Sequence, residues 1–312
     1  MIDVTTQPTT RRRASPRAGR IIAVAGLALL VGIVSTWIPG VVGTAAAAAL
    51  PWLGLALVLL VALALVLARR VTLVLLAPVL VWTLAMLPSA PGLGAASPPQ
   101  STPIEIVSQN VRAHSGGAAA SAAELADRSA DVIALTELDG DSLEAARETL
   151  ASSYPYSYAI GTVAVWSRYP IADAQPLTLG LDWKRALRVV VETPDADIAV
   201  YVMHAASVRP GVQQERDTML SGIAAAVSSD PAESIVVVGD FNAASADPAL
   251  SAVRSQLDWV RPTDGTLGLT WPAALPLARI DHVFVRGLTV LESTTARFGN
   301  SDHLATVTTL VG

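Results

Sequence analysis

Residues 235–243 read IVVVGDFNA, and this stretch decides the fold more than any other part of the chain. Its first four residues are apolar and β-branched, which predicts a short strand at 235–238 that is buried on both faces. Gly239 ends the apolar run, and Asp240 and Asn242 follow directly. A buried strand that ends in polar side chains is typical of a sheet whose strand ends carry a functional site.

Five other segments repeat this arrangement, each with a polar residue where a predicted strand begins or ends. They contribute Asn110 (VSQNVRA), Glu137 (VIALTELDG), His204 (AVYVMHAAS), Asp281 (RIDHVFV), and Asp302 with His303 (SDHLATV). Taken singly, each has an ordinary explanation as a loop acid, a turn, a strand cap or a buried histidine. Independent ordinary explanations would not produce the same arrangement in six segments, so we expect these residues to form one site.

The predicted elements after residue 103 are short strands with helices between them. Strands are predicted at 104–109, 132–136, 162–166, 187–192, 198–203, 235–238, 280–285 and 304–310. Helices are predicted at 119–129, 142–151 and 212–227. We expect an α/β fold in which two packed β-sheets are flanked by helices.

The first third of the chain is different, because three apolar stretches follow a polar start. The stretches cover residues 21–38, 44–67 and 71–87, and each is close to the roughly 20 residues of a spanning helix. We expect residues 1–20 to be a disordered cytoplasmic N-terminus, 21–87 a three-helix membrane anchor, 88–103 a linker and 104–312 the catalytic domain. Cleavage of the first stretch as a signal peptide is the alternative, and it leaves two spans in place.

Arginine predicts the orientation of the anchor. Five arginines precede the first stretch, two lie between the second and third, and none lies between the first and second. Because positive loops stay in the cytoplasm, three crossings place the domain after residue 87 outside the cell membrane. The protein is thus expected to be a multi-pass membrane protein with an extracytoplasmic catalytic domain.

Charge and cysteine content exclude some functions. The chain has no cysteine, which excludes disulfides, thiol nucleophiles and cysteine-ligated zinc. Residues 1–100 carry seven arginines and one acid, whereas the remainder carries 14 basic and 25 acidic residues. A net charge of −11 beyond residue 100 argues against a nucleic-acid substrate, because affinity for nucleic acid comes largely from Lys and Arg.

The order Asn, Glu, SRYP, Arg, His, GDFN, TWP, IDH, SDH over residues 104–312 resembles that of the endonuclease/exonuclease/phosphatase superfamily. The resemblance implies a four-layer, DNase I-like α/β sandwich and a divalent metal, Mg²⁺ or alternatively Mn²⁺. The layout of three spans and an external domain also resembles actinobacterial membrane proteins of the vancomycin/teicoplanin-resistance type. That second resemblance rests on layout more than on motif.

The superfamily resemblance implies a role for each polar residue. The implied metal ligands are Glu137 and Asp302, supported by Asn110. Asp240 would activate the nucleophilic water, with Asn242 orienting Asp240 or the phosphate, and His303 would act with Asp281 as general acid–base or phosphate ligand. His204 would bind a phosphoryl oxygen, as would Arg185, for which Arg188 is the alternative.

Three further residues near these motifs are not assigned a catalytic role. His282 is expected to pack behind Asp281 or to donate a hydrogen bond to it, and Trp271 is expected to be structural or to line the cleft. Many nuclease relatives carry an acid two residues after the first Asn, where this chain has Arg112. A second metal site is therefore in doubt, and Arg112 would instead contact an anionic substrate.

The leading functional hypothesis is a phosphatase or phosphodiesterase that acts on a lipid-linked or small phosphate ester at the outer membrane surface. The second is a membrane-tethered nuclease that uses the same residues, and only this hypothesis requires nucleic acid as a partner. The third is a non-catalytic anchoring or binding module, which the full set of acid–base residues disfavours.

Overall fold

The computed structural model describes residues 16–90, 101–209 and 211–312. Residues 1–15 of the predicted N-terminal tail and 91–100 of the predicted linker lie outside the described residues. Contacts within the chain divide it into two compact units. One holds Met1–Ser35 and Leu50–Met86, and the other holds Thr36–Ala49 and Leu87–Gly312, which includes every predicted site residue.

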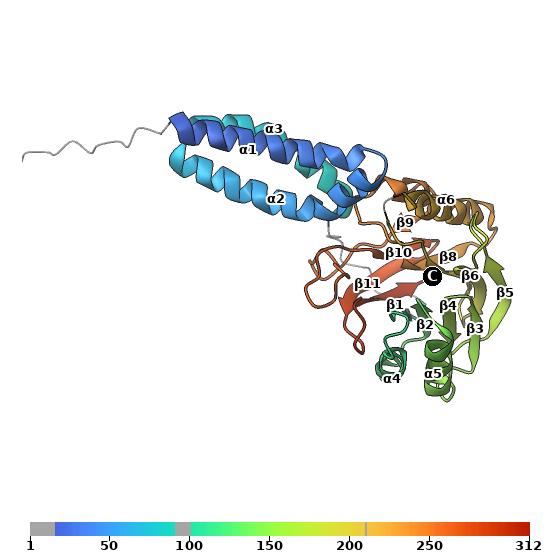
Figure 1. Ribbon diagram of the computed structural model, residues 1–312. Coiled ribbons are helices and arrows are strands. Elements are labelled where there is room, and N and C mark those ends of the chain that lie inside the picture. The colour runs from blue at the N-terminus through green and yellow to red at the C-terminus, as the bar shows by residue number, and fades with distance from the viewer. Residues whose placement is uncertain (1–15, 91–100, 210) are drawn as a thin grey trace, which may run out of the picture. The chain divides into compact units, whose positions relative to one another are not determined.

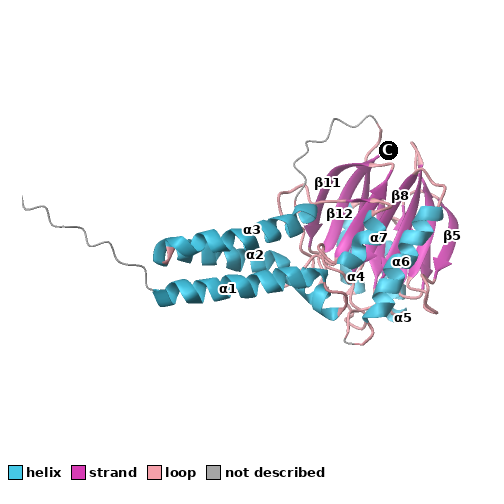
Figure 2. Ribbon diagram, turned by 90° about the horizontal axis from the view of Figure 1, so that it is seen from above, coloured by secondary structure: helices cyan, strands magenta, loops and turns pink. Residues whose placement is uncertain are grey.

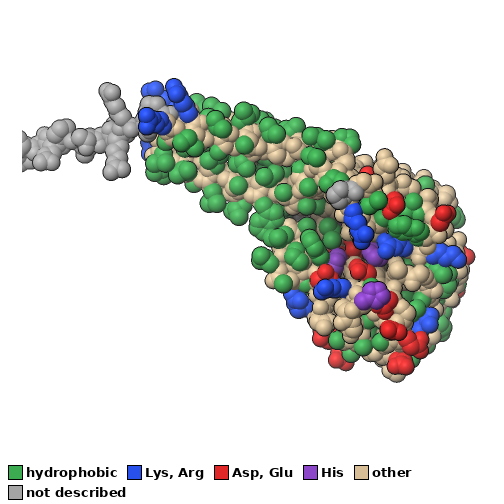
Figure 3. All heavy atoms as spheres, in the orientation of Figure 1, with side chains coloured by type: hydrophobic (Ala, Val, Ile, Leu, Met, Phe, Trp, Pro, Cys, Tyr) green, Lys and Arg blue, Asp and Glu red, His purple; other side chains and the backbone are tan. Residues whose placement is uncertain are grey.

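The first unit is built from α1 (Pro16–Val34), α3 (Thr72–Met86) and the part of α2 (Val41–Leu67) that begins at Leu50. All three, with their short 3₁₀ extensions, are long and apolar enough to cross a membrane. Helix α1 begins five residues before the predicted span, because proline fits the first turn of a helix and arginine is a good helix former. Figure 3 shows basic side chains at one end of this apolar helical unit.

The second unit contains two six-stranded sheets (Figure 1). The strand order in the first sheet is β11-β12-β1-β2-β4-β3, and only β1 and β2 are parallel. Its strands are β1 (Ile104–Asn110), β2 (Val132–Thr136), β3 (Tyr156–Ile160), β4 (Val163–Ser167), β11 (Thr289–Ala296) and β12 (Ala305–Val311).

The second sheet has the order β5-β6-β7-β8-β10-β9, and only β7 and β8 are parallel. Its strands are β5 (Ile171–Leu177), β6 (Ala186–Glu192), β7 (Asp197–His204), β8 (Ser234–Asp240), β9 (Asp258–Trp259) and β10 (Asp281–Arg286). In both sheets, therefore, antiparallel strands flank a single parallel pair.

Helices cover the outer face of each sheet, whereas the inner faces pack on each other (Figures 1 and 2). The core between the sheets is aliphatic and includes Ile106, Val200 and Val236. Helices α4 (Ala118–Arg128) and α5 (Gly140–Leu150) cover the first sheet, and α6 (Gln213–Ser229) and α7 (Ser251–Arg254) cover the second. This confirms the predicted four-layer α/β sandwich preceded by three long apolar helices.

The eight predicted strands and three predicted helices are all present, with ends within two residues of the predicted ones. The four strands that sequence patterning missed are β3, β5, β9 and β11, which are the edge strands of the two sheets. Edge strands are partly exposed and alternate with polar residues, so they lack the apolar runs that reveal central strands. The short helix α7 was also missed.

A buried ion pair ties the end of α6 to the second sheet. The Asp230 carboxylate accepts hydrogen bonds from Arg188 Nε on β6 (2.6 Å) and from Tyr201 Oη on β7 (2.5 Å). The Asp230 side chain is only 3% exposed, so it has little access to water. Burial opposes its ionisation, but the bonds from Arg188 and Tyr201 outweigh burial and lower the pKa of Asp230 to about 2.

We therefore expect Asp230→Asn to destabilise the full chain by about 2 kcal/mol at neutral pH, the equivalent of the pKa difference between folded and unfolded states. A lowered pKa stabilises the fold above the ordinary carboxyl pKa and ceases to do so as the pH falls through about 2. Thermal unfolding of both proteins in detergent should thus converge as the pH falls from 4 towards 2. The control is Asp173→Asn, which removes the exposed partner of Arg188 and should cost under about 1 kcal/mol. An equal loss of unfolding free energy in Asp230→Asn and Asp173→Asn would contradict the assignment of the stabilising ion pair to Asp230.

Candidate active site

Strand register brings three of the predicted site residues side by side at one end of the second sheet. His204 on β7 pairs with Asp240 on the parallel strand β8, and Asp281 on β10 pairs with Asp240 from the other side. Polar residues at neighbouring strand ends thus come together without any long-range loop. Three of the six predicted segments therefore meet through strand register alone.

Gly239 makes the close approach of β7 and β8 possible. Its φ is +133°, a backbone conformation that residues with a side chain rarely adopt. A Cβ atom at this position would lie 2.0 Å from the Met203 carbonyl oxygen. No other residue could occupy this position without moving β7 away from β8. The glycine of the GDFN motif is therefore a spacing residue that sets where Asp240 lies relative to His204.

Asp240, Asp281 and His303 form the centre of the site. Each offers a ligand atom that lies within 4.8 Å of the other two, and all three are buried. His303 Nδ1 lies 2.9 Å from Asp281 Oδ2, which fixes the imidazole ring. The second oxygen of Asp281, Oδ1, is buried and has no hydrogen-bond partner among the described residues.

Asn110 connects the two sheets at the site. Its Nδ2 donates to Glu137 Oε2 (2.7 Å) from the first sheet side and to Asp240 Oδ2 (3.0 Å) from the second sheet. Its Oδ1 accepts from the backbone N–H of Arg112 (2.9 Å), which fixes the amide orientation. Glu137 directly follows β2 and has a left-handed backbone conformation (φ +59°). This conformation turns the main chain away from the direction of the strand.

Burial and charge set the protonation of the central cluster. Burial raises the pKa of Asp240 well above its ordinary value, and the negative charge of Asp281 raises it further. Burial acts against the charged form of His303, but the charge of Asp281 and its hydrogen bond outweigh burial and raise the pKa of His303. The cluster therefore pairs a protonated imidazole with Asp281 and leaves Asp240 suited to accept a proton near neutral pH.

His204 is placed as a neutral hydrogen-bonding group. Its Nε2 lies 3.9 Å from Glu137 Oε2, and its Nδ1 lies 3.4 Å from Thr162 Oγ1. Burial and the positive charges of Arg185 and His303 lower the pKa of His204 to about 3. An uncharged imidazole can hydrogen-bond to a phosphoryl oxygen without changing the net charge of the site.

Asn242 orients Asp240 through the backbone. The Asn242 N–H donates to Asp240 Oδ1 (2.8 Å), while its side-chain Nδ2 donates to the Ala205 carbonyl oxygen (2.9 Å), next to His204. Its left-handed backbone (φ +47°) suits asparagine, which tolerates this conformation better than most residues. The backbone of Asn242 thus contacts Asp240, while its side chain is bonded to Ala205.

The two candidate arginines differ in their surroundings. Arg188 is engaged by Asp230 and Asp173, away from the cluster. Arg185 opens β6 beside the site, where its guanidinium lies 5.1 Å from the Trp183 ring and interacts with the charges of Glu137 and Asp240. Of the two arginines, Arg185 therefore lies beside the cluster and Arg188 does not.

The loop that carries Asp302 and His303 is held by residues that sequence reasoning missed. Ser301 Oγ donates to the Asn110 carbonyl oxygen (2.6 Å) and accepts from the His303 N–H (3.1 Å). Thr270 Oγ1 accepts from the Asp281 N–H (3.3 Å). Serine and threonine are common loop residues, so no sequence signal distinguished these two. Asp302 itself is partly exposed, and its negative charge favours the protonated form of His303.

His282 is fully buried and its two ring nitrogens are occupied. Trp259 Nε1 donates to His282 Nδ1 (3.1 Å), and His282 Nε2 lies 2.9 Å from the Ala243 carbonyl oxygen, to which it donates. Burial and the charge of Arg279 lower its pKa well below the ordinary value. Of the two predicted roles, His282 thus has the packing one, and its ring bonds join Trp259 and Ala243.

The donor set fits a divalent metal ion. Carboxylate oxygens are the ligands that Mg²⁺ and Mn²⁺ prefer, and two buried carboxylates so close together require positive charge nearby. The unpartnered Asp281 Oδ1 is an orphaned acceptor within the cluster. Of the predicted ligands, Glu137 and Asn110 contact each other beside it, and no described contact of the Asp302 side chain joins it to them. Figure 3 shows acidic and histidine side chains gathered on one face of this unit, with basic side chains beside them.

The fold is shared with several solved structures. A crystal structure of D. rerio TDP2 complexed with a single-strand DNA product is 19% identical, covers 68% of this chain and 100% of its own, and has a TM-score of 0.56. An endonuclease/exonuclease/phosphatase from Bacteroides vulgatus is 16% identical over 67% of this chain and 99% of its own, with a TM-score of 0.57. Sphingomyelinase C from Streptomyces griseocarneus is also 16% identical over 67% and 99%, with a TM-score of 0.51.

No curated protein matches the sequence. Residues 107–303, however, match the Endonuclease/Exonuclease/phosphatase family, and this match spans the strands from β1 to the His303 loop. It covers more than half of the chain and includes each of the polar strand ends described above. A buried Asp/His cluster able to hold a metal lies within it. The chain therefore belongs to the endonuclease/exonuclease/phosphatase family of phosphoester hydrolases.

Proposed function

We propose that this chain is a membrane-anchored, metal-dependent phosphatase or phosphodiesterase that acts on lipid-linked or small phosphate esters outside the cytoplasmic membrane. The observation that carries the proposal is the buried Asp240, Asp281 and His303 cluster, joined to Glu137 through Asn110. The three candidate spans and the acidic domain support a lipid-linked substrate, because such a substrate is delivered by the membrane and needs no basic surface.

The proposed chemistry assigns one task to each contact. Asp240, whose pKa is raised, accepts a proton from the attacking water, and Asn242 keeps the carboxylate in place. The protonated His303, oriented by Asp281, donates a hydrogen bond or a proton on the phosphate side. Arg185 and neutral His204 bind phosphoryl oxygens. A divalent metal held by Glu137, with Asn110 and Asp302 in support, supplies positive charge where negative charge develops.

The nuclease alternative has one specific support, the D. rerio relative whose structure holds a single-strand DNA product. Against it stands the net charge of −11 after residue 100, which repels a polyanion. The layout resemblance to resistance-type membrane proteins favours undecaprenyl-linked phosphate as the first lipid to test. All of these substrates would use the same residues, so a parallel assay separates them.

We expect the full chain in detergent with Mg²⁺ to release phosphate from undecaprenyl pyrophosphate or cleave small phosphodiesters, and to leave duplex and single-stranded DNA intact. Asp240→Asn should lower kcat by about 10²–10⁴-fold, because it removes a general base. Chelation by EDTA should abolish turnover, and Asp127→Asn, an exposed carboxylate on α4, should leave it unchanged. DNA cleavage alone would instead establish the nuclease. Activity unaffected by Asp240→Asn would contradict the assigned base.

The metal assignment can be tested separately from the base. Glu137→Gln keeps the shape of the side chain but removes its charge, so the Mg²⁺ concentration that gives half-maximal activity should rise at least about tenfold. Asp240→Asn should lower kcat with a smaller change in that concentration. If Asp240→Asn or Asp281→Asn shifts the Mg²⁺ dependence and Glu137→Gln does not, the buried cluster itself holds the metal.

The proposed orientation can be tested by exploiting the absence of cysteine in the chain. We expect a single cysteine at Ser255, which is exposed in the catalytic domain, to react with a membrane-impermeant maleimide in intact cells. A single cysteine at Thr10 should react only after permeabilisation, because the arginine-rich N-terminus is proposed to be cytoplasmic. The reverse labelling pattern would place the catalytic domain inside the cell.

A further inference from the structure

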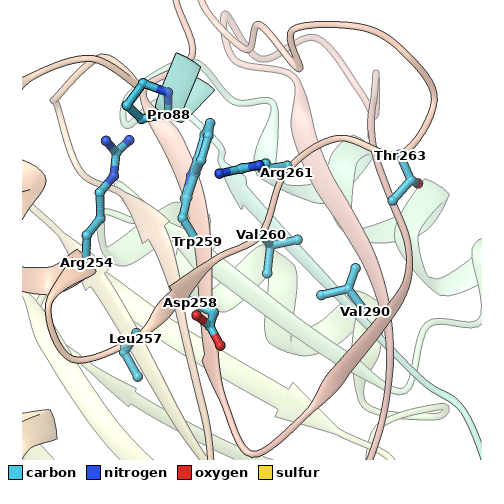
Figure 4. Close-up of a pocket in the computed structure, with 9 residues that line it drawn as sticks. All are labelled: Pro88, Arg254, Leu257, Asp258, Trp259, Val260, Arg261, Thr263 and Val290. Carbon is cyan, nitrogen blue, oxygen red and sulfur yellow. The ribbon is translucent and has the colours of Figure 1, made fainter. Parts of the chain in front are cut away.

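A cavity lies away from the candidate active site, beside α7, β9 and the loop that follows β9 (Figure 4). It has a volume of about 500 Å³, and none of the predicted site residues lines it. Its walls combine two arginines and a tryptophan with apolar side chains. The lining residues that carry the argument are Arg254, Trp259, Arg261, Pro88, Leu257 and Val290.

Cationic side chains are concentrated around the tryptophan. Figure 4 shows Arg254 and Arg261 on either side of the Trp259 ring. The guanidinium of Arg254 lies 4.9 Å from the ring centroid. That of Arg279, which is buried and does not line the cavity, lies 4.8 Å from it. Three positive charges thus surround one aromatic ring in a domain that is acidic as a whole.

These charges have no close acidic partner, although Asp247 acts on Arg254 and Asp281 on Arg279 from a greater distance. Among the described residues, none of the three arginines forms an ion pair with an acidic side chain. Asp258, the one acid that lines the pocket, lies at the opposite end from both lining guanidinium groups (Figure 4). Burial, together with the positive charge of Arg261, lowers the pKa of Arg254 to about 10. A group with such a shift would be stabilised by an added anion.

Backbone carbonyl oxygens hold two of the arginines in place. Arg254 donates through Nη2 to the Ser245 carbonyl oxygen, but its Nε is buried without a partner. Arg279 is 2% exposed and donates to the Val260 carbonyl oxygen (3.0 Å), while its Nη1 has no partner. These contacts fix both guanidinium groups beside the Trp259 ring, and Arg254 and Arg261 are the two cationic side chains that line the cavity and can donate to an anion there.

We propose that this pocket binds a phosphate group, either free or in the headgroup of an anionic phospholipid. Two guanidinium groups provide the planar, paired donors that phosphate oxygens accept. The apolar walls at Pro88, Leu257 and Val290 suit the carbon atoms next to a headgroup phosphate. The site is separate from the catalytic cluster and does not depend on the proposed function.

Hydrogen bonds connect the pocket to two segments of the candidate active site. Trp259 donates its indole N–H to His282, the neighbour of Asp281 in sequence, and His282 in turn holds the carbonyl oxygen of Ala243 after the GDFN motif. An anion that fixes Trp259 therefore also fixes two segments of the candidate active site. Trp259 connects the two sites but contacts none of the reacting atoms.

The test measures binding to the detergent-solubilised full chain by isothermal titration, in the Asp240→Asn background so that no probe is consumed. The probes are inorganic phosphate, phosphatidylglycerol in neutral micelles, and zwitterionic phosphatidylcholine in the same micelles. The pocket variants are Arg254→Gln and Arg261→Gln. Arg147→Gln, which removes an exposed arginine on α5, is the matched control.

We expect at least one anionic probe to bind, with a Kd that rises tenfold or more in both pocket variants and stays unchanged in the control. Phosphate binding equal to that of phosphatidylglycerol would identify the free anion as ligand, whereas binding of phosphatidylglycerol alone would identify the lipid. Arg254 also has a structural contact, so Arg261→Gln, whose side chain is exposed, decides the matter if Arg254→Gln fails to fold. No binding, binding unaffected by Arg261→Gln, or equal binding of phosphatidylcholine would overturn the proposal.

Discussion

The burial of two carboxylates on adjacent strands is the constraint on which the rest of the site depends. Asp240 and Asp281 face each other in register, and their mutual repulsion would expel one of them into solvent if nothing offset it. His303 offsets it from the first sheet through its contact with Asp281, and the amide of Asn110 does so through Asp240. Asn110 ends β1, and His303 lies in the loop that leads into β12, so both compensating groups come from the side of the first sheet. The contacts of the site therefore also link the two sheets.

The central strands and the site positions could be predicted from the sequence because they share one physical origin. A strand that is buried on both faces consists mainly of Val, Ile and Leu. A polar residue at the end of such a run is easily recognised, as Asp240 is after residues 235–238. The edge strands β3, β5, β9 and β11 lie partly in solvent, so their sequences carry no such contrast. Distances along the chain indicate nothing about which strands are neighbours across the sheets.

Contacts between distant segments account for what the sequence could not show about the site. The order of motifs identified Asn110 as a participant but did not reveal that it links Glu137 to Asp240. Ser301 and Thr270 were missed because their roles consist of bonds to backbone atoms, which leave no mark on the type of the bonded residue. Arg185 and Arg188 are equivalent by residue type, and only the ion pair between Arg188 and Asp230 separates them.

Both sheets have the same central plan, one parallel pair joined through a helix and flanked by antiparallel strands. The carboxyl ends of the two parallel pairs, β1 with β2 and β7 with β8, carry Asn110 and Glu137 in one half and His204 and Asp240 in the other. The second unit is thus approximately twofold in plan. The corresponding strand ends of its two sheets are in contact where Asn110 donates to Asp240. Because each half supplies groups to the same cluster, a change at the strand ends of either half alters the whole site, and the two halves cannot diverge independently.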